Sequence, residues 1–221
     1  MSSISVAGDV SGAISIAAPS AAGSGVLTLP TGTDTLVGKA TTDTLTNKTL
    51  TAPAISSAVM TTMASSVLTS GTAVASTSGT SIDFTSIPSW VKRITVMFNG
   101  VSTNGVSYAL VQVGSGSVTT SGYASSGAVV YGSNLCAITT STQGFVIYMD
   151  FASDLRNGAV VLCLLSSNTW VASGNIIASG TGRSASVGGN IALGGTLDRV
   201  RITTANGTDA FDAGSINILY E

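Results

Sequence analysis

The chain has 221 residues and no histidine, and its eight basic and ten acidic residues leave a net charge of −2. Charged residues make up 8% of the sequence, whereas a typical soluble domain is about 25% charged. With so few basic groups we expect no nucleic-acid partner, and the lack of histidine excludes Ser-His-Asp catalysis and imidazole-bound zinc.

The apolar residues occur in short runs. The longest run covers residues 159–165, whereas a membrane-spanning helix needs about 20 apolar residues. The first basic residue is Lys39, so the N-terminus lacks the basic start of a secretory signal. We therefore expect a soluble chain with no membrane insertion, and free thiols at Cys136 and Cys163.

Residues 1–83 contain no aromatic side chain. Aromatic side chains bury the largest areas in a core, so this part can hardly offset its conformational entropy alone. A nine-residue repeat places Leu36 and Leu45 at equivalent positions, each with an Asp two residues before it and a Lys three residues after it. We expect an extended or intertwined fibre segment over residues 1–53, with a Thr-rich linker as the alternative.

Residues 54–80 form an uncharged connector. Four aliphatic residues recur in it every four positions: Ile55, Val59, Met63 and Val67. This spacing indicates one face of a short helix, but the many Ser and Thr residues weaken helices. The connector is therefore predicted as either a short helix or extended strands, with a hinge at residues 76–80.

Residues 81–221 are predicted to form a β domain. Its candidate strands are rich in β-branched and aromatic residues. They cover residues 93–98, 108–113, 145–151, 159–165, 170–177, 186–193, 197–203 and 215–220. This number of strands, with turn signals between them and no convincing helix, indicates a β-sandwich of jelly-roll type.

Two features of the predicted strands concern their surroundings. Residues 159–165 are continuously apolar, which indicates a strand covered on both faces. Before this run, Asn157 and Gly158 form a dipeptide typical of a hairpin turn.

The chain resembles bacteriophage tail-fibre and tail-spike proteins in two regions. Residues 42–53 resemble a segment that recurs near the virion-proximal end of such proteins. The C-terminal part resembles a domain common in phage tail proteins, through residues 87–94, 168–174, 195–201 and 211–218.

The resemblance implies a homotrimeric fibre or spike located on the virion and assembled in the bacterial cytoplasm. Residues 1–53 would attach it to another virion protein, and residues 81–221 would contact the host surface. Because the shaft region is short, a capsid (head) fibre or decoration protein is the alternative. A glycan-binding module or a depolymerase acting on host surface polysaccharide is the second alternative.

Few residues are suited to catalysis. A glycosidase needs two carboxylates about 5–10 Å apart, and the closest acid pairs in the sequence are Asp150 with Asp154 and Asp209 with Asp212. A turn role is favoured for each pair, because Asp hydrogen-bonds its own backbone in turns. No twelve-residue calcium loop surrounds them. We therefore predict a non-enzymatic protein with no cofactor and no metal site.

Recognition is predicted in residues 114–144, which are uncharged and rich in Ser, Thr and Gly. Tyr123 and Tyr131 offer contact area at low entropic cost, and Asn134 offers adaptable hydrogen bonds. The alternative is a plain loop with a short strand. Trp90 is a further candidate for stacking on a sugar, although we favour a core position for it.

Overall fold

The computed structural model describes residues 3–7, 13–17, 49 and 68–221, apart from 133 and 134. The prediction of a mainly β chain is confirmed for these residues, because every regular element among them is a strand. They contain no helix that is long and apolar enough to cross a membrane. The chain divides into two units, residues 1–59 and 60–221.

The N-terminal unit contains one described pair of strands. β1 (Ser3–Ala7) and β2 (Ala13–Ala17) are antiparallel, with Ile4 opposite Ile16. The nine-residue repeat and the helical pattern predicted for the connector lie outside the described residues. The virion-attachment role of residues 1–53 therefore stays a prediction.

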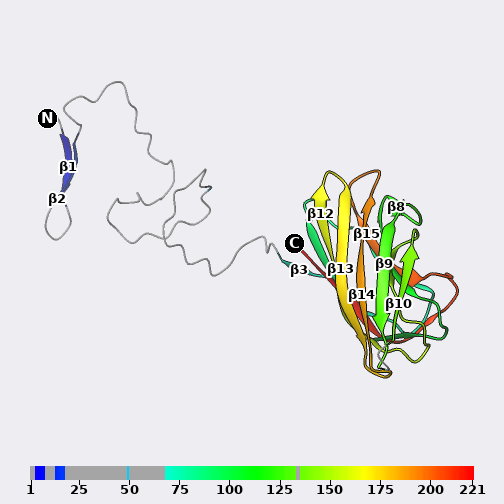
Figure 1. Ribbon diagram of the computed structural model, residues 1–221. Coiled ribbons are helices and arrows are strands. Elements are labelled where there is room, and N and C mark those ends of the chain that lie inside the picture. The colour runs from blue at the N-terminus through cyan, green and yellow to red at the C-terminus, as the bar shows by residue number, and fades with distance from the viewer. Residues whose placement is uncertain (1–2, 8–12, 18–48, 50–67, 133–134) are drawn as a thin grey trace. The chain divides into compact units, whose positions relative to one another are not determined.

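The C-terminal unit consists of two antiparallel sheets around one core (Figure 1). The larger sheet has nine strands, in the order β10 (Cys136–Ser141), β9 (Ala124–Val130), β14 (Arg183–Ala192), β13 (Thr169–Ala178), β12 (Arg156–Ser166), β6 (Arg93–Thr103), β16 (Phe211–Tyr220) and β3 (Thr69–Ser70), with β4 (Val74–Ala75) also paired to β16. The smaller sheet has the order β11 (Phe145–Ile147), β7 (Ala109–Ser115), β15 (Arg199–Thr204) and β5 (Ser81–Phe84), with β8 (Ser117–Val118) beside β7. The two-sheet architecture agrees with the prediction of a sandwich, and the jelly-roll topology stays a prediction.

Alternation of apolar and polar residues places the core between the two sheets. In β6 the predicted inward residues Ile94, Val96 and Phe98 are all buried. Val160 in β12 lies opposite Val96 and is also fully buried. Successive side chains of a strand point to opposite faces, so one face of each of these strands forms the core.

The apolar run at residues 159–165 differs from its prediction. Val160 and Leu162 are fully buried, but Leu165 is 67% exposed and Val161 is only partly buried. The prediction of a strand covered on both faces is therefore wrong for the single chain, since the second face turns outward. The sheet thus leaves an apolar row on its outer side.

The predicted hairpin turn at Asn157 and Gly158 is also wrong, because both residues lie within β12. The ladder between β12 and β6 shifts at this point. Gly158 has a φ of +133°, and a Cβ there would lie 2.5 Å from the Asn175 carbonyl oxygen. The glycine therefore serves a β-bulge and a close backbone approach.

The β unit starts before its predicted boundary at residue 81. β3 and β4, which lie in the predicted connector, both pair with β16. Ser76, in the predicted hinge, is fully buried, and its hydroxyl donates to the Ala213 carbonyl oxygen at 2.7 Å. These contacts fix residues 69–76 along one margin of the larger sheet.

The two sheets lie in direct contact where β9 meets β11. The Ser125 hydroxyl accepts a hydrogen bond from the Val146 N–H (3.0 Å) and donates one to the Gly188 carbonyl (3.2 Å). A Cβ on Gly127 would lie 2.6 Å from the Val146 carbonyl oxygen. Small residues at both positions of β9 therefore allow its backbone to lie directly against β11.

Buried charges close one end of the core. Asp154 and Arg156 are fully buried, and Arg183 is 4% exposed. The Asp154 carboxylate accepts hydrogen bonds from Arg183 (2.9 Å) and from the Thr181 hydroxyl (2.6 Å). The Arg183 guanidinium also lies 3.5 Å from the centre of the Phe151 ring. Burial lowers the pKa of Arg156.

We predict that Asp154→Asn destabilises the β unit strongly, because it leaves the buried Arg183 without its fully buried charge partner and with only the partly exposed Asp150. Removing one member of a buried ion pair costs about 3–5 kcal/mol. Urea unfolding measures this loss. Asp83→Asn is the matched control: it breaks the ion pair of Asp83 with Arg201, whose side chains are each 36% exposed, and should cost at most about 1 kcal/mol. Equal losses in the two variants would contradict the structural role of the buried pair.

Candidate functional site

The outer side of the smaller sheet carries one apolar and one polar side chain, Leu110 and Gln112, that are buried although they point away from the core. Leu110 and Gln112 in β7 alternate with the core residues Val111 and Val113 and therefore point away from the core. Both are nevertheless buried, with 1% and 5% exposure. Something other than the second sheet must therefore cover them.

The cover is the turn between β10 and β11. The Gln112 side-chain amide donates to the Gln143 carbonyl oxygen at 2.9 Å. A Cβ on Gly144 would lie 3.0 Å from the Leu110 Cβ and 3.1 Å from the Gln112 Cγ. The turn thus lies directly on β7, and it belongs to the segment 114–144 in which recognition is predicted.

Two adjoining hollows flank this turn. The first, the Gln112 hollow, has a volume of about 300 Å³ and is lined by Gln112, Gln143, Arg201 and threonine hydroxyls. The second, the Tyr108 hollow, has a volume of about 260 Å³ and is lined by Tyr108 and by residues 139–143. Leu110, Gln143 and Ala205 line both hollows. The two hollows therefore form one continuous surface feature.

The Gln112 hollow offers hydrogen-bonding groups that the described residues leave available. Gln112 uses its amide N–H on Gln143, and no described residue donates to its Oε1. Arg201 binds Asp83 through Nε (2.7 Å) and Nη2 (3.0 Å). This carboxylate raises the pKa of Arg201 and balances its charge. The hollow is therefore close to neutral, with an amide acceptor and a guanidinium donor.

A short turn forms the rim of the Gln112 hollow. The Asn206 Oδ1 accepts hydrogen bonds from the N–H groups of Thr208 (3.0 Å) and Asp209 (3.1 Å). The Asp209 carboxylate accepts from the Asn206 amide (2.7 Å) and the Ser107 N–H (2.9 Å), which lowers its pKa. Asn206 and Gly207 thus form a turn, and internal hydrogen bonds fix its geometry.

Three tyrosines extend the polar surface beyond the Tyr108 hollow. The rings of Tyr108 and Tyr148 meet edge to face, with centroids 4.7 Å apart. The Tyr131 hydroxyl donates to Asp150 at 3.5 Å, and its ring lies 4.4 Å from the Arg183 guanidinium carbon. Burial and the Tyr148 hydroxyl raise the pKa of Tyr108 and of Tyr131. Their hydroxyls are therefore neutral hydrogen-bonding groups at physiological pH.

The predicted site residues occupy different places. Tyr131 belongs to the tyrosine cluster, but Tyr123 lies in the core with 2% exposure. The Tyr123 hydroxyl bonds the backbone of Val113 and Thr119, and its ring packs edge to face on Phe145 at 5.1 Å. Its role in the structure is to tie β7 to the segment that follows it.

The other two predicted residues do not join the cluster. Asn134 lies outside the described residues. Trp90 is 47% exposed, with its ring centroid 5.9 Å from that of Tyr220, so the core position predicted for it is wrong. Successive strand partners across the larger sheet connect Arg93, close to Trp90, with Ala124, so these two residues lie at the same height along the strands. Tyr131 lies seven residues beyond Ala124, about 23 Å along the strand, so Trp90 and Tyr131 lie at opposite ends.

Sequence reasoning missed Gln112, Gln143 and Arg201. One signal was present: the predicted strand over residues 108–113 has Tyr108, Leu110 and Gln112 on one face and only small apolar residues on the other. A mixed aromatic and amide face on a strand indicates a surface that another group covers. The sequence did not show that Gln143 covers Gln112 or that Arg201 lies beside them in the same hollow.

The carboxylates are engaged elsewhere. Asp154 and Asp150 both pair with Arg183, and Asp212 accepts a hydrogen bond from Ser102. Asp154 also accepts from the Phe151 N–H (3.1 Å), which is the predicted turn role. Among the described residues, no carboxylate lines either hollow, and no three His, Cys, Asp or Glu residues gather as metal ligands.

No protein-family model, curated protein or solved structure matches this chain.

We predict that Tyr123 makes the β unit sensitive to alkaline pH. Burial raises the pKa of Tyr123 to about 12 from the usual 10, so the unfolded chain loses this proton first. The stabilising effect is complete below pH 10 and is lost as the pH rises from 10 to 12, by up to about 2–3 kcal/mol. The free energy of unfolding in urea should fall less steeply over this range in Tyr123→Phe than in the wild type. Parallel curves would contradict the prediction.

Proposed function

We propose that this chain is a non-enzymatic structural protein of a bacteriophage virion, of the fibre or spike type. Residues 1–53 join several copies, as a homotrimer, and attach them to another virion protein. The C-terminal β unit contacts the bacterial surface. The resemblance of residues 42–53 and of the C-terminal blocks to phage fibre proteins supports this proposal.

The observation that carries the host-contact role is the pair of adjoining hollows on the smaller sheet. Sugars present closely spaced hydroxyls that both donate and accept hydrogen bonds. Gln112 and Arg201 supply an acceptor and a donor in one hollow, and the hydroxyl oxygens of its threonines are further acceptors. Tyr108 adds an aromatic wall in the other hollow. A neutral or weakly charged surface glycan fits this chemistry.

A binding role is favoured over a depolymerase. Glycoside hydrolysis by the usual route needs two carboxylates on either side of the scissile bond. The described carboxylates near the tyrosine cluster are held in ion pairs with Arg183, and none lines a hollow. The hollows thus have groups to hold a sugar and lack the pair that would cleave it.

An array of bacterial surface polysaccharides tests this proposal. The wild-type chain should bind at least one of them, and Gln112→Leu and Tyr108→Leu should each weaken binding at least about tenfold by removing a hydrogen-bonding or stacking group. Trp90→Leu is the matched control, because Trp90 is an exposed aromatic residue that lines neither hollow. Binding that survives both hollow variants, or no binding to any bacterial glycan, would contradict the proposal.

A further inference from the structure

The outer face of the larger sheet is nearly free of charge. The six adjacent strands β10, β9, β14, β13, β12 and β6 turn alternate residues away from the core, and we name these outward residues the open face. The only charged side chain among them is Arg93, at the first residue of β6, and it is paired with Glu221 at 2.9 Å. Hydroxyl, amide, aliphatic and sulfur-containing side chains make up the rest.

Apolar side chains gather at one corner of the open face. Ile177, Ser184, Val130 and Cys136 are successive partners across β13, β14, β9 and β10. Ile138 lies two residues beyond Cys136 on β10. Ile177, Val130 and Ile138 are 49%, 53% and 70% exposed. This corner therefore combines three of the more exposed aliphatic side chains of the β unit.

The strand at this corner has an unprotected edge. β10 pairs with β9 on one side and with no described strand on the other. A charge, a proline or a bulge usually prevents an edge strand from pairing with another chain. Residues 136–141 contain none of these. At the other margin, β16 is covered by β3 and β4. One margin of the larger sheet is therefore paired with short strands, whereas the margin at β10 is unpaired among the described residues.

The open face is large enough for a stable contact. Six strands about 4.8 Å apart and about eight residues long cover roughly 600–700 Å² in projection. Each partner in a standard protein interface buries about 800 Å² of accessible surface. The accessible surface area of the open face is larger than its projected area, because side chains make the surface uneven. The open face therefore reaches the size of a standard interface.

The absence of charge favours an identical partner. A charge close to a symmetry axis would lie beside the same charge of a neighbouring copy, and burying it would be costly; the open face avoids both penalties. The outer side of the smaller sheet differs, because Asp83, Arg199 and Arg201 lie on it. We infer that a second copy of this chain packs on the open face, with contact centred on Val130, Cys136 and Ile138. The inference rests on the multi-copy assembly in the proposed function.

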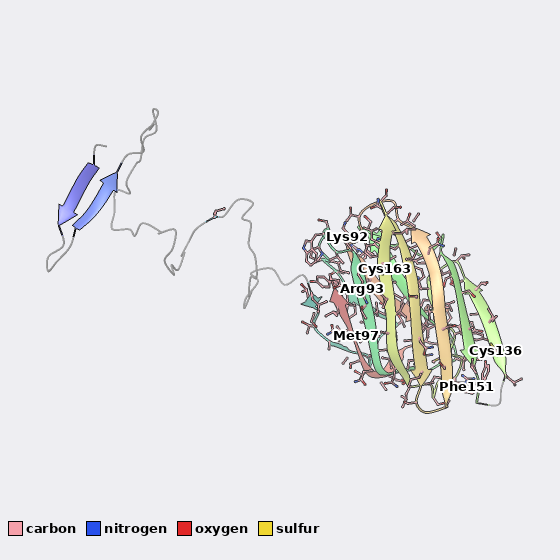
Figure 2. The ribbon with its side chains drawn as sticks, turned by 60° about the vertical axis from the view of Figure 1, so that its left-hand side comes forward. Lys92, Arg93, Met97, Cys136, Phe151 and Cys163 are labelled. Atoms are coloured by element: carbon pink, nitrogen blue, oxygen red, sulfur yellow. The ribbon has the colours of Figure 1, made fainter. Side chains whose placement is uncertain are left out.

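The two native cysteines report directly on this contact. Cys136 and Cys163 are free thiols on the open face, and Figure 2 shows them well apart, Cys136 on the edge strand β10 and Cys163 on β12 near the middle of the larger sheet. They are the only cysteines in the chain. If copies pack on this face, maleimide reaches Cys136 slowly in the assembled protein.

The experiment compares full-length variants by sedimentation and by the rate of maleimide labelling at Cys136. Ser173→Lys with Ser186→Lys places two charges at exposed positions in the middle of the open face. Ile138→Lys is a second, single variant at the exposed edge. Ser117→Lys, at an exposed position in β8 of the smaller sheet, is the matched control. Circular dichroism verifies that each variant is folded.

The expected result is a multi-copy assembly in the wild type and the control, with Cys136 labelled at least about tenfold more slowly than in the open-face variants. Those variants should form smaller species. An assembled wild type whose Cys136 reacts as fast as in the variants would overturn the inference and leave the proposed assembly standing, since copies would then meet elsewhere. A monomeric wild type would overturn both.

Discussion

The close approach of β9 to β11 is the contact on which the arrangement of the β unit depends. Ser125 and Gly127 are small enough for the β9 backbone to lie on β11, and Ser125 hydrogen-bonds both sheets. This contact brings the turn after β10 over Gln112. The hollows on the smaller sheet and the exposed edge at β10 therefore have the same structural origin.

Charge divides the two outer sides of the β unit. Ion pairs such as Arg201 with Asp83 lie on the smaller sheet, beside the hollows. Six strands of the larger sheet turn a nearly uncharged face outward. The two outer sides thus differ in charge, and this difference is consistent with ligand binding on one side and contact between copies on the other.

Local patterns in the sequence predicted several of the strands but missed β5, β9 and β10, and they did not predict the surroundings of the strands. The alternation of Ile94, Val96 and Phe98 predicted the inward face of β6, because strand periodicity is a local property. Asn157 and Gly158 looked like a turn, but contact with a neighbouring strand places them in a bulge. The site depends on distant partners in the same way: Gln112 bonds a residue 31 positions away, and Arg201 one 118 positions away. Such pairings follow from the tertiary fold, so the sequence gives no direct sign of them.

Hydrogen exchange of the assembled full-length chain, followed by mass spectrometry, tests the central claim that the two sides have different roles. Every second amide of β10 points away from β9 and has no partner among the described strands. We expect residues 136–141 to be protected in the assembly and to lose this protection when the assembly is dissociated by dilution, whereas exchange in β15 stays unchanged. Exchange of the outward amides of β10 that is equally fast in both states would contradict it.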